Sequence, residues 1–333
     1  RPLNDLRWET MTLLAHGAFG TMVDKTAYDG WLDPVFYQRL ATVFQEADEK
    51  RKHFGQPLHA DVGIYFSHRT RDWLGRENAA KAWQGTLGTH KAFVYAHVPW
   101  GIVLDENAGL ERLQSFPVIA LPNISILLES EVAALTEYVE AGGNLIITGT
   151  TGLHDRYGNP RDTSALERLI GGRWKRTLDS KDNHIRFNKT ESDSPFASGI
   201  PADWPFLVHG NAVVYEPITA KAWGELLPPH RTVLQREGKE ATHFPMSADT
   251  ANSSGPAILV NQVGRGKVVT LACSPGEAAT SEFHITEARQ LLPNAVRYLL
   301  PEPMISVTAP HIEESDGTGG GDTIRGPCTV KSQ

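Results

Sequence analysis

Cysteine is scarce in this sequence. Only Cys273 and Cys328 occur among 333 residues. A disulfide scaffold needs several thiol pairs and a cysteine-based zinc site needs clustered thiolates, so both classes are excluded. The histidines of the first hundred residues show neither His-x-x-His nor His-Glu-x-x-His spacing, which leaves no zinc signal. We therefore expect no metal and no cofactor.

Long apolar runs and an excess of basic residues are also missing. No apolar run approaches the roughly 20 residues that cross a bilayer, so no membrane partner is predicted. The formal net charge is −7, which argues against a general nucleic-acid surface. The hydrophobic fraction of 40% still supports sizeable cores, and the length leaves room for two domains.

The two ends of the sequence are unusual. It begins RPLNDLRWET, with no initiator Met and no signal peptide, and enters a predicted helix at once. It ends EESDGTGGGDTIRGPCTVKSQ, which is polar, glycine-rich and too poor in apolar residues to bury a core. We interpret the chain as an internal fragment of a longer protein.

The clearest local pattern lies between Phe116 and Pro160. The apolar run 117–122 predicts a strand buried on both faces, and the periodic apolar residues after Glu131 predict a helix. Gly142-Gly143 ends that helix, since glycine adopts the left-handed conformation at little cost. The run 144–148 is then a second buried strand, parallel to the first. Its C-terminal end is where α/β sheets place ligands or nucleophiles.

The remaining sequence continues the α/β pattern. Residues 92–96 fit either a strand or the continuation of a helix, and 101–104 is similarly ambiguous. The other predicted elements are a strand at 62–67, a polar loop at 68–72, helices at 78–87, 164–170 and 287–300, a β-rich stretch at 183–245, and a hairpin of 256–263 with 267–272. The predicted fold class is α/β.

The first 55 residues do not form a complete domain by themselves. A helix capped by Asp5 or Asn4, a strand at 18–23, a polar loop and a helix opened by Asp33-Pro34 follow one another. This helix–strand–helix order lacks the strand that would precede it. It is typical of the last section of a repeating β/α fold.

Several motifs carry a family resemblance. The segments LPNISILLESEVAALTEYVEAGGNLIITG, GLHDRYGNPR, PAILVNQVGRGKVV and LLPNAVRYLLP occur in that order. Residues 56–302 thereby resemble the trimerisation domain of glycoside hydrolase family 42 β-galactosidases, which has a flavodoxin-like, class I glutamine-amidotransferase-like fold. Residues 1–55 resemble the incomplete end of the preceding (β/α)8 barrel, and 303–333 the start of a β-sandwich domain followed by a disordered tail. Within that superfamily, the residues of these motifs are more similar to those of uncharacterised barrel glycosidases and related α-L-fucosidases than to those of standard β-galactosidases.

The resemblance implies a homo-oligomer, a trimer, with a carbohydrate substrate in the parent protein. Such retaining glycosidases use two carboxylates about 5–5.5 Å apart. These lie at the C-terminal face of the barrel, on strands that would precede Arg1, so we expect no catalytic residue in this chain. In the loop after the last barrel strand, Asp24 and Lys25 either contact a sugar or hold the loop as an ion pair. Trp100 either stacks on a sugar or is a buried structural residue.

An alternative is an autonomous hydrolase or amidotransferase-like enzyme. Working amidotransferases of that fold place a cysteine in a Gly-x-Cys-x-Gly turn, with a histidine further along. Here the turn reads Thr148-Gly-Thr-Thr-Gly152, with Thr150 at the nucleophile position and His284 as a candidate partner. A threonine hydroxyl is far harder to ionise than a thiol, which favours a turn-forming role for Thr150.

Overall fold

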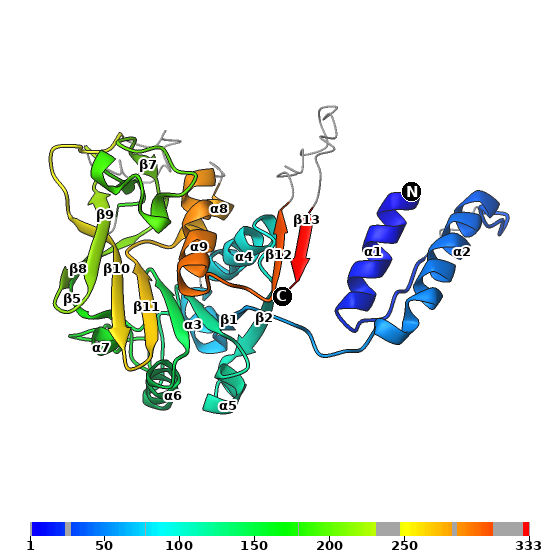
Figure 1. Cartoon of the computed structure of the whole chain (residues 1–333), viewed down its shortest axis with the longest axis horizontal. Helices are drawn as coiled ribbons and strands as arrows, with labels where there is room; N and C mark the ends of the chain where they lie inside the picture. The colour runs from blue at the N-terminus through cyan, green and yellow to red at the C-terminus, as the bar shows by residue number, and fades with distance from the viewer. Residues whose placement is uncertain are drawn as a thin grey trace. The chain divides into compact units, whose positions relative to one another are not determined.

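The computed structural model describes residues 2–23, 28–76, 78–178, 180–230, 247–281, 285–308 and 329–332 (Figure 1). The chain divides into two compact units, Arg1–His59 and Ala60–Gln333. Each unit is considered by itself. Among the described residues, none of the helices has the length and apolar character needed to cross a membrane.

The first unit is a pair of helices. α1 covers Leu3–Ala15 and α2 covers Pro34–Glu49, followed by a 3-10 turn at Arg51–His53. Asp33 caps α2 as predicted, because its carboxylate accepts a hydrogen bond from the Val35 amide at 2.9 Å.

The strand predicted at 18–23 does not form, which corrects the sequence interpretation. Residues 18–23 have no regular secondary structure. A strand needs a hydrogen-bonded neighbour, and the described part of residues 1–59 contains no second strand to supply one. The small core of this unit is formed by Leu6, Leu40 and Val43. Several aromatic side chains remain exposed, among them Trp8, Phe19, Tyr28 and Trp31.

The second unit is built on a nine-stranded sheet with the order β2-β1-β3-β4-β11-β10-β9-β6-β7. Its first five strands are mutually parallel. They are β2 (Trp100–Leu104), β1 (Val62–Phe66), β3 (Val118–Pro122), β4 (Asn144–Thr148) and β11 (Gly266–Leu271). The predicted strands at 62–67, 117–122 and 144–148 are thus confirmed, as is the parallel pairing of the last two.

Antiparallel strands extend this sheet beyond β11. The predicted hairpin is confirmed, because β10 (Gly255–Val263) pairs antiparallel with β11. Next come β9 (Lys221–Leu227), β6 (His184–Arg186) and β7 (Phe206–Leu207). Two small sheets pair β5 (Gly172–Leu178) with β8 (Ala212–Pro217), and β12 (Ile305–Thr308) with β13 (Thr329–Ser332). β13 forms although its polar sequence predicts no regular structure.

Helices cover both faces of the parallel strands. One core cluster joins the sheet to α4 (Ala79–Tyr95), α8 (Pro275–Thr280) and α9 (Thr286–Leu299). A second cluster on the other face involves α5 (Leu110–Leu113), α6 (Glu129–Glu140) and α7 (Glu167–Ile170). In β3, Val118 and Ala120 belong to the first cluster, whereas Ile119 and Leu121 belong to the second. This alternation explains why the buried strands are apolar without interruption.

Two ambiguous or wrong predictions concern the region after β1. Residues 92–95 are the last turn of α4, so the helical alternative was correct there. Residues 68–72 are not a loop but belong to α3 (His68–Leu74). The Ser67 hydroxyl caps that helix by accepting from the Thr70 amide at 3.1 Å. The polar residues of 68–72 resemble a loop in the sequence, because the partners that bind them, Asp105 and Glu131, lie far away along the chain.

Glycines allow α4 and α8 to touch at the backbone. A Cβ on Gly88 would lie 1.8 Å from the carbonyl oxygen of Gly276, and one on Gly276 would lie 2.2 Å from that of Gly85. Both distances are far below any van der Waals contact. The approach of α8 to α4 therefore depends on the absence of side chains at these positions.

We expect Gly88→Ala to lower the free energy of unfolding by about 1–3 kcal/mol or more, because α8 must move away from α4. This occurs although alanine favours a helix over glycine. The control is Gly109→Ala, where a Cβ meets nothing within 4 Å, and which should change stability by less than about 1 kcal/mol. Urea unfolding measures both. Equal stability of the two variants would contradict the close contact.

Candidate functional site

The C-terminal ends of the five parallel strands meet at one edge of the sheet. From β2 the chain returns past β1 to reach β3, so the winding direction reverses between β1 and β3. Ligands of open α/β sheets bind in the crevice at such a reversal. Two polar clusters lie along this edge. We call them the Asp105 network and the Asn123 cluster.

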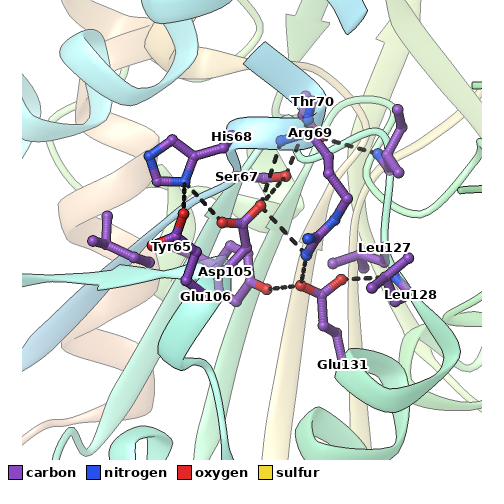
Figure 2. A network of polar contacts seen from close by, with 12 residues as sticks. Tyr65, Ser67, His68, Arg69, Thr70, Asp105, Glu106, Leu127, Leu128 and Glu131 are labelled. Carbon is purple, nitrogen blue, oxygen red and sulfur yellow. Dashed lines mark hydrogen bonds and ion pairs between the residues drawn. The ribbon is translucent and has the colours of Figure 1, made fainter. Parts of the chain in front are cut away.

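The Asp105 network begins with a fully buried carboxylate just after β2 (Figure 2). Asp105 accepts hydrogen bonds from the Ser67 hydroxyl at 3.2 Å and the Arg69 amide at 3.4 Å. His68 Nδ1 lies 2.9 Å from the other carboxylate oxygen. The Arg69 guanidinium is 3.3 Å away as an ion pair. A single carboxylate thus fixes the first residues of α3 onto the end of β2.

Arg69 also reaches Glu131 in the first turn of α6 (Figure 2). Glu131 is 7% exposed and accepts a hydrogen bond from the Tyr65 hydroxyl at 2.8 Å and from the Leu128 amide at 2.7 Å. Arg69 is therefore shared between two buried carboxylates from different elements. The network ties β1, α3, β2 and α6 together at the edge of the sheet.

The electrostatics of this network agree with a charged Asp105. Burial alone raises the pKa of Asp105, but the His68 hydrogen bond and the Arg69 charge together hold that pKa below its ordinary value. Burial and the neighbouring Glu131 carboxylate raise the pKa of Tyr65, which keeps its hydroxyl protonated as a donor. A histidine whose Nδ1 is held by a buried carboxylate also occurs in general bases. Here the same carboxylate also contacts Ser67 and Arg69.

The Asn123 cluster lies at the ends of β3, β4 and β11. Asn123 has a positive φ of 59°, and its side chain makes contacts across the edge. Its amide oxygen accepts from the Thr150 amide at 2.8 Å and from the Thr150 hydroxyl at 2.9 Å. Its amide nitrogen donates to Glu277 at 2.5 Å. Ser125 Oγ and Thr150 Oγ1 are 2.7 Å apart.

These contacts describe a braced turn around Thr150. The hydroxyl bonds to an amide oxygen and to another hydroxyl, and neither group is a base. His284 lies outside the described residues, so its proposed pairing with Thr150 stays a prediction. The nearby thiol does not offer a substitute nucleophile, because burial raises the pKa of Cys273 to about 12.

One substrate-binding candidate, Trp100, lies away from this edge. Trp100 begins β2 and therefore lies at the N-terminal end of the strands, where its ring is 4.5 Å from that of His90 in an edge-to-face contact. It also packs against the first core cluster. Asp24 and Lys25 lie outside the described residues. Among the residues that the structure does describe, no group of three or more His, Cys, Asp or Glu side chains has an arrangement able to hold a metal ion.

Sequence reasoning missed Arg69 and Glu131. Arg69 lies in a stretch predicted as a polar loop, and Glu131 looks like an ordinary surface residue of a helix. Their pairing spans 62 positions in the sequence. One local signal existed for Glu131. Its spacing after Leu128 allows the side chain to cap the first turn of α6, as the hydrogen bond to the Leu128 amide shows.

A comparison with protein families identifies the second unit. The family model described as "Beta-galactosidase trimerisation domain" matches residues 60–290. That range is more than half of the chain, and the chain belongs to this family. None of the curated proteins matches the sequence.

Solved structures share the fold at low sequence identity. An α-L-fucosidase isoenzyme 2 from Paenibacillus thiaminolyticus aligns with a TM-score of 0.73 and 18% identity, over 93% of this chain and 44% of that one. A GH42 β-galactosidase from G. stearothermophilus gives 0.64 and 16%, over 92% and 42%. A ThuA-like protein from Bacteroides uniformis gives 0.51 and 15%, over 74% and 94%. The chain thus spans less than half the length of the first two.

We expect Asp105→Asn to lower the free energy of unfolding at neutral pH by about 2 kcal/mol, because Arg69 loses a buried partner. The folded-state pKa of Asp105 is depressed, so its contribution is complete above about pH 4, the unfolded pKa, and is lost as pH falls through the folded pKa. The difference between variant and wild type should therefore shrink in acid. Glu106→Gln, at a side chain that is 73% exposed, is the control and should change little. A stability difference that stays constant through the acid range would contradict a charged Asp105.

For the turn, we expect Thr150→Ser to keep the stability of the wild type, because the hydroxyl that bonds Asn123 and Ser125 is retained. Thr150→Val removes those hydrogen bonds and should cost about 1–2 kcal/mol. Neither the wild type nor Thr150→Ser should form a covalent adduct with acyl electrophiles. An adduct mapped by mass spectrometry to Thr150, and lost in His284→Ala, would overturn the turn-forming role.

Proposed function

We propose that this chain is the C-terminal part of a glycoside hydrolase of the β-galactosidase or α-L-fucosidase type. Residues 56–302 form a homo-oligomerisation module without chemistry of its own, which also caps the site of the parent enzyme. Residues 1–55 are the end of its (β/α)8 barrel, and 303–333 begin a further β-sandwich domain. The observation that carries the proposal is the family match over residues 60–290.

The lengths of the similar structures support the parentage. More than nine-tenths of this chain aligns with the fucosidase and the galactosidase, but the alignments cover less than half of each of those proteins. The remainder of such a protein is long enough to hold a barrel and its carboxylate pair. In the alignment with the ThuA-like protein, in contrast, 74% of this chain covers 94% of that protein.

The strand order supports the finer description of the second unit. Read along the sheet, β2-β1-β3-β4-β11 has the connectivity of the flavodoxin-like order 2-1-3-4-5, with β11 as the fifth strand. The amidotransferase-like fold belongs to the same doubly wound class. In this proposal the turn at Thr150 keeps the geometry of a nucleophile junction while its side chains only brace the edge.

The exposed side chains of the first unit favour its assignment to a barrel end. Trp8, Phe19 and Trp31 are 71%, 93% and 72% exposed. At about 25 cal/mol per Å2, covering a few hundred Å2 of such surface corresponds to several kcal/mol. Neighbouring barrel elements would cover it. The proposal keeps Asp24 and Lys25 as site-lining candidates at the barrel mouth, Trp100 as a sugar-stacking candidate, and a carbohydrate as the substrate of the parent.

The autonomous enzyme is the less favoured alternative. It needs a base at the Thr150 hydroxyl, whereas the hydrogen bonds of that hydroxyl go to Asn123 and Ser125. It also gives no role to the first unit, which carries its own small core. The glycosidase proposal gives a role to both units, the first as the end of the barrel and the second as the oligomerisation module.

We expect the isolated chain to hydrolyse no aryl glycoside, because the acid and the nucleophile belong to barrel strands that precede Arg1. A panel of nitrophenyl glycosides with different sugars and anomeric configurations tests this, with an intact glycosidase as the positive control. Turnover that disappears when a carboxylate of this chain is changed to its amide would refute the proposal.

A further inference from the structure

The outward face of α4 is apolar, which is unusual for a helix at the surface of a sheet. Trp83, Leu87, His90 and Val94 follow one another at spacings of four, three and four residues, so they form one stripe along the helix. Ala92, which packs into the first core cluster, and Gly88, which packs against α8, lie on the opposite side of the helix. The stripe therefore faces away from the core of its own unit.

The stripe is exposed but held in place. Trp83, Leu87 and Val94 are 37%, 52% and 49% exposed. The Trp83 ring stacks on Phe66 at the end of β1, with the ring centroids 4.8 Å apart. His90 makes an edge-to-face contact with Trp100 at the start of β2. A surface whose rings are already ordered loses little conformational entropy when a partner covers it.

The edge strand β2 continues this surface. Gly101 and Val103 face the second core cluster, so Trp100 and Ile102 face the side of α4. Ile102 is 46% exposed and pairs with Ile64, between the strand positions that contact Trp83 and His90. We call Trp83, Leu87, Val94 and Ile102 the α4 surface.

Other large exposed apolar side chains of the matched family range are separated from one another along the chain, and one of them, Leu74, ends α3. Tyr157, Trp204 and Ile218 each lie in a different loop or turn. The α4 surface instead gathers four large side chains from one helix and one adjoining strand. Contiguous exposed apolar residues of this kind mark protein–protein contacts.

We infer that the α4 surface is a contact with a second copy of this chain. The inference rests on the proposed oligomerisation function, and it assigns that function to a defined part of the molecule. The heptad-like spacing of the stripe suits packing against a helix, because side chains at this spacing insert between those of a facing helix. In a cyclic trimer the contact is head-to-tail, so the neighbouring copy presents a different surface to α4.

The test compares lysine substitutions in the full chain. Leu87→Lys and Val94→Lys place a charge on the α4 surface and keep a good helix former. Ile218→Lys, at a side chain that is 62% exposed, is the matched control in the same unit, and Trp31→Lys is the control in the first unit. Sedimentation velocity over a wide concentration range measures the association state. Circular dichroism checks that each variant is folded.

The wild type should associate, and each α4 variant should raise its dissociation constant by roughly tenfold or more. The Ile218→Lys and Trp31→Lys variants should associate like the wild type. A second measurement, amide hydrogen exchange, should show protection of residues 83–94 that increases with protein concentration in the wild type.

Three results would overturn the inference. They are a wild type that stays monomeric, α4 variants that associate normally, and loss of association in Trp31→Lys alone, which would assign the contact to the first unit. The glycoside assay is independent of these outcomes. If the chain is inactive and the α4 variants associate like the wild type, only the inference is rejected. If the chain has glycosidase activity of its own, the proposed function is rejected.

Discussion

Burial of the parallel strands on both faces is the constraint on which the second unit depends. Each of these strands sends alternate side chains into two separate clusters, so helices must cover both sides. Backbone groups within the sheet are satisfied by the neighbouring strands. Beyond the ends of the strands, backbone groups lack such neighbours, and polar side chains must supply their hydrogen-bond partners.

The C-terminal edge solves that problem with two kinds of contact. Around Asp105, two carboxylates share one guanidinium, so charges are buried together with their partners. Around Asn123, a side-chain amide bridges a turn and a carboxylate. Both clusters occupy the place where related folds put ligands or nucleophiles. Most of the polar contacts of each cluster stay within it, although Arg69 Nε has no hydrogen-bond partner among the described residues.

The exposed apolar side chains are the second feature of the molecule that bears on its function. Large apolar side chains are exposed in both units, as the aromatic side chains of the first unit and the α4 surface of the second. An assembly module is expected to have this distribution, with ordered side chains on a rigid scaffold. The two units differ in how they achieve order. The second carries two large clusters, whereas the described part of the first has one small cluster centred on Leu6, Leu40 and Val43.

The sequence by itself determined most of the elements of the second unit. Continuous apolar runs predicted β1, β3 and β4, Gly142-Gly143 marked the end of α6, and ordered motifs indicated the family. It failed at 18–23, where an apolar run lacks a strand to pair with, and at α3, whose polar residues resemble a loop. Only the tertiary structure joined Arg69 to Asp105 and Glu131, and Asn123 to Thr150 and Glu277. Those contacts link residues far apart in the chain, and local patterns carry no record of which distant partner will satisfy a buried polar group.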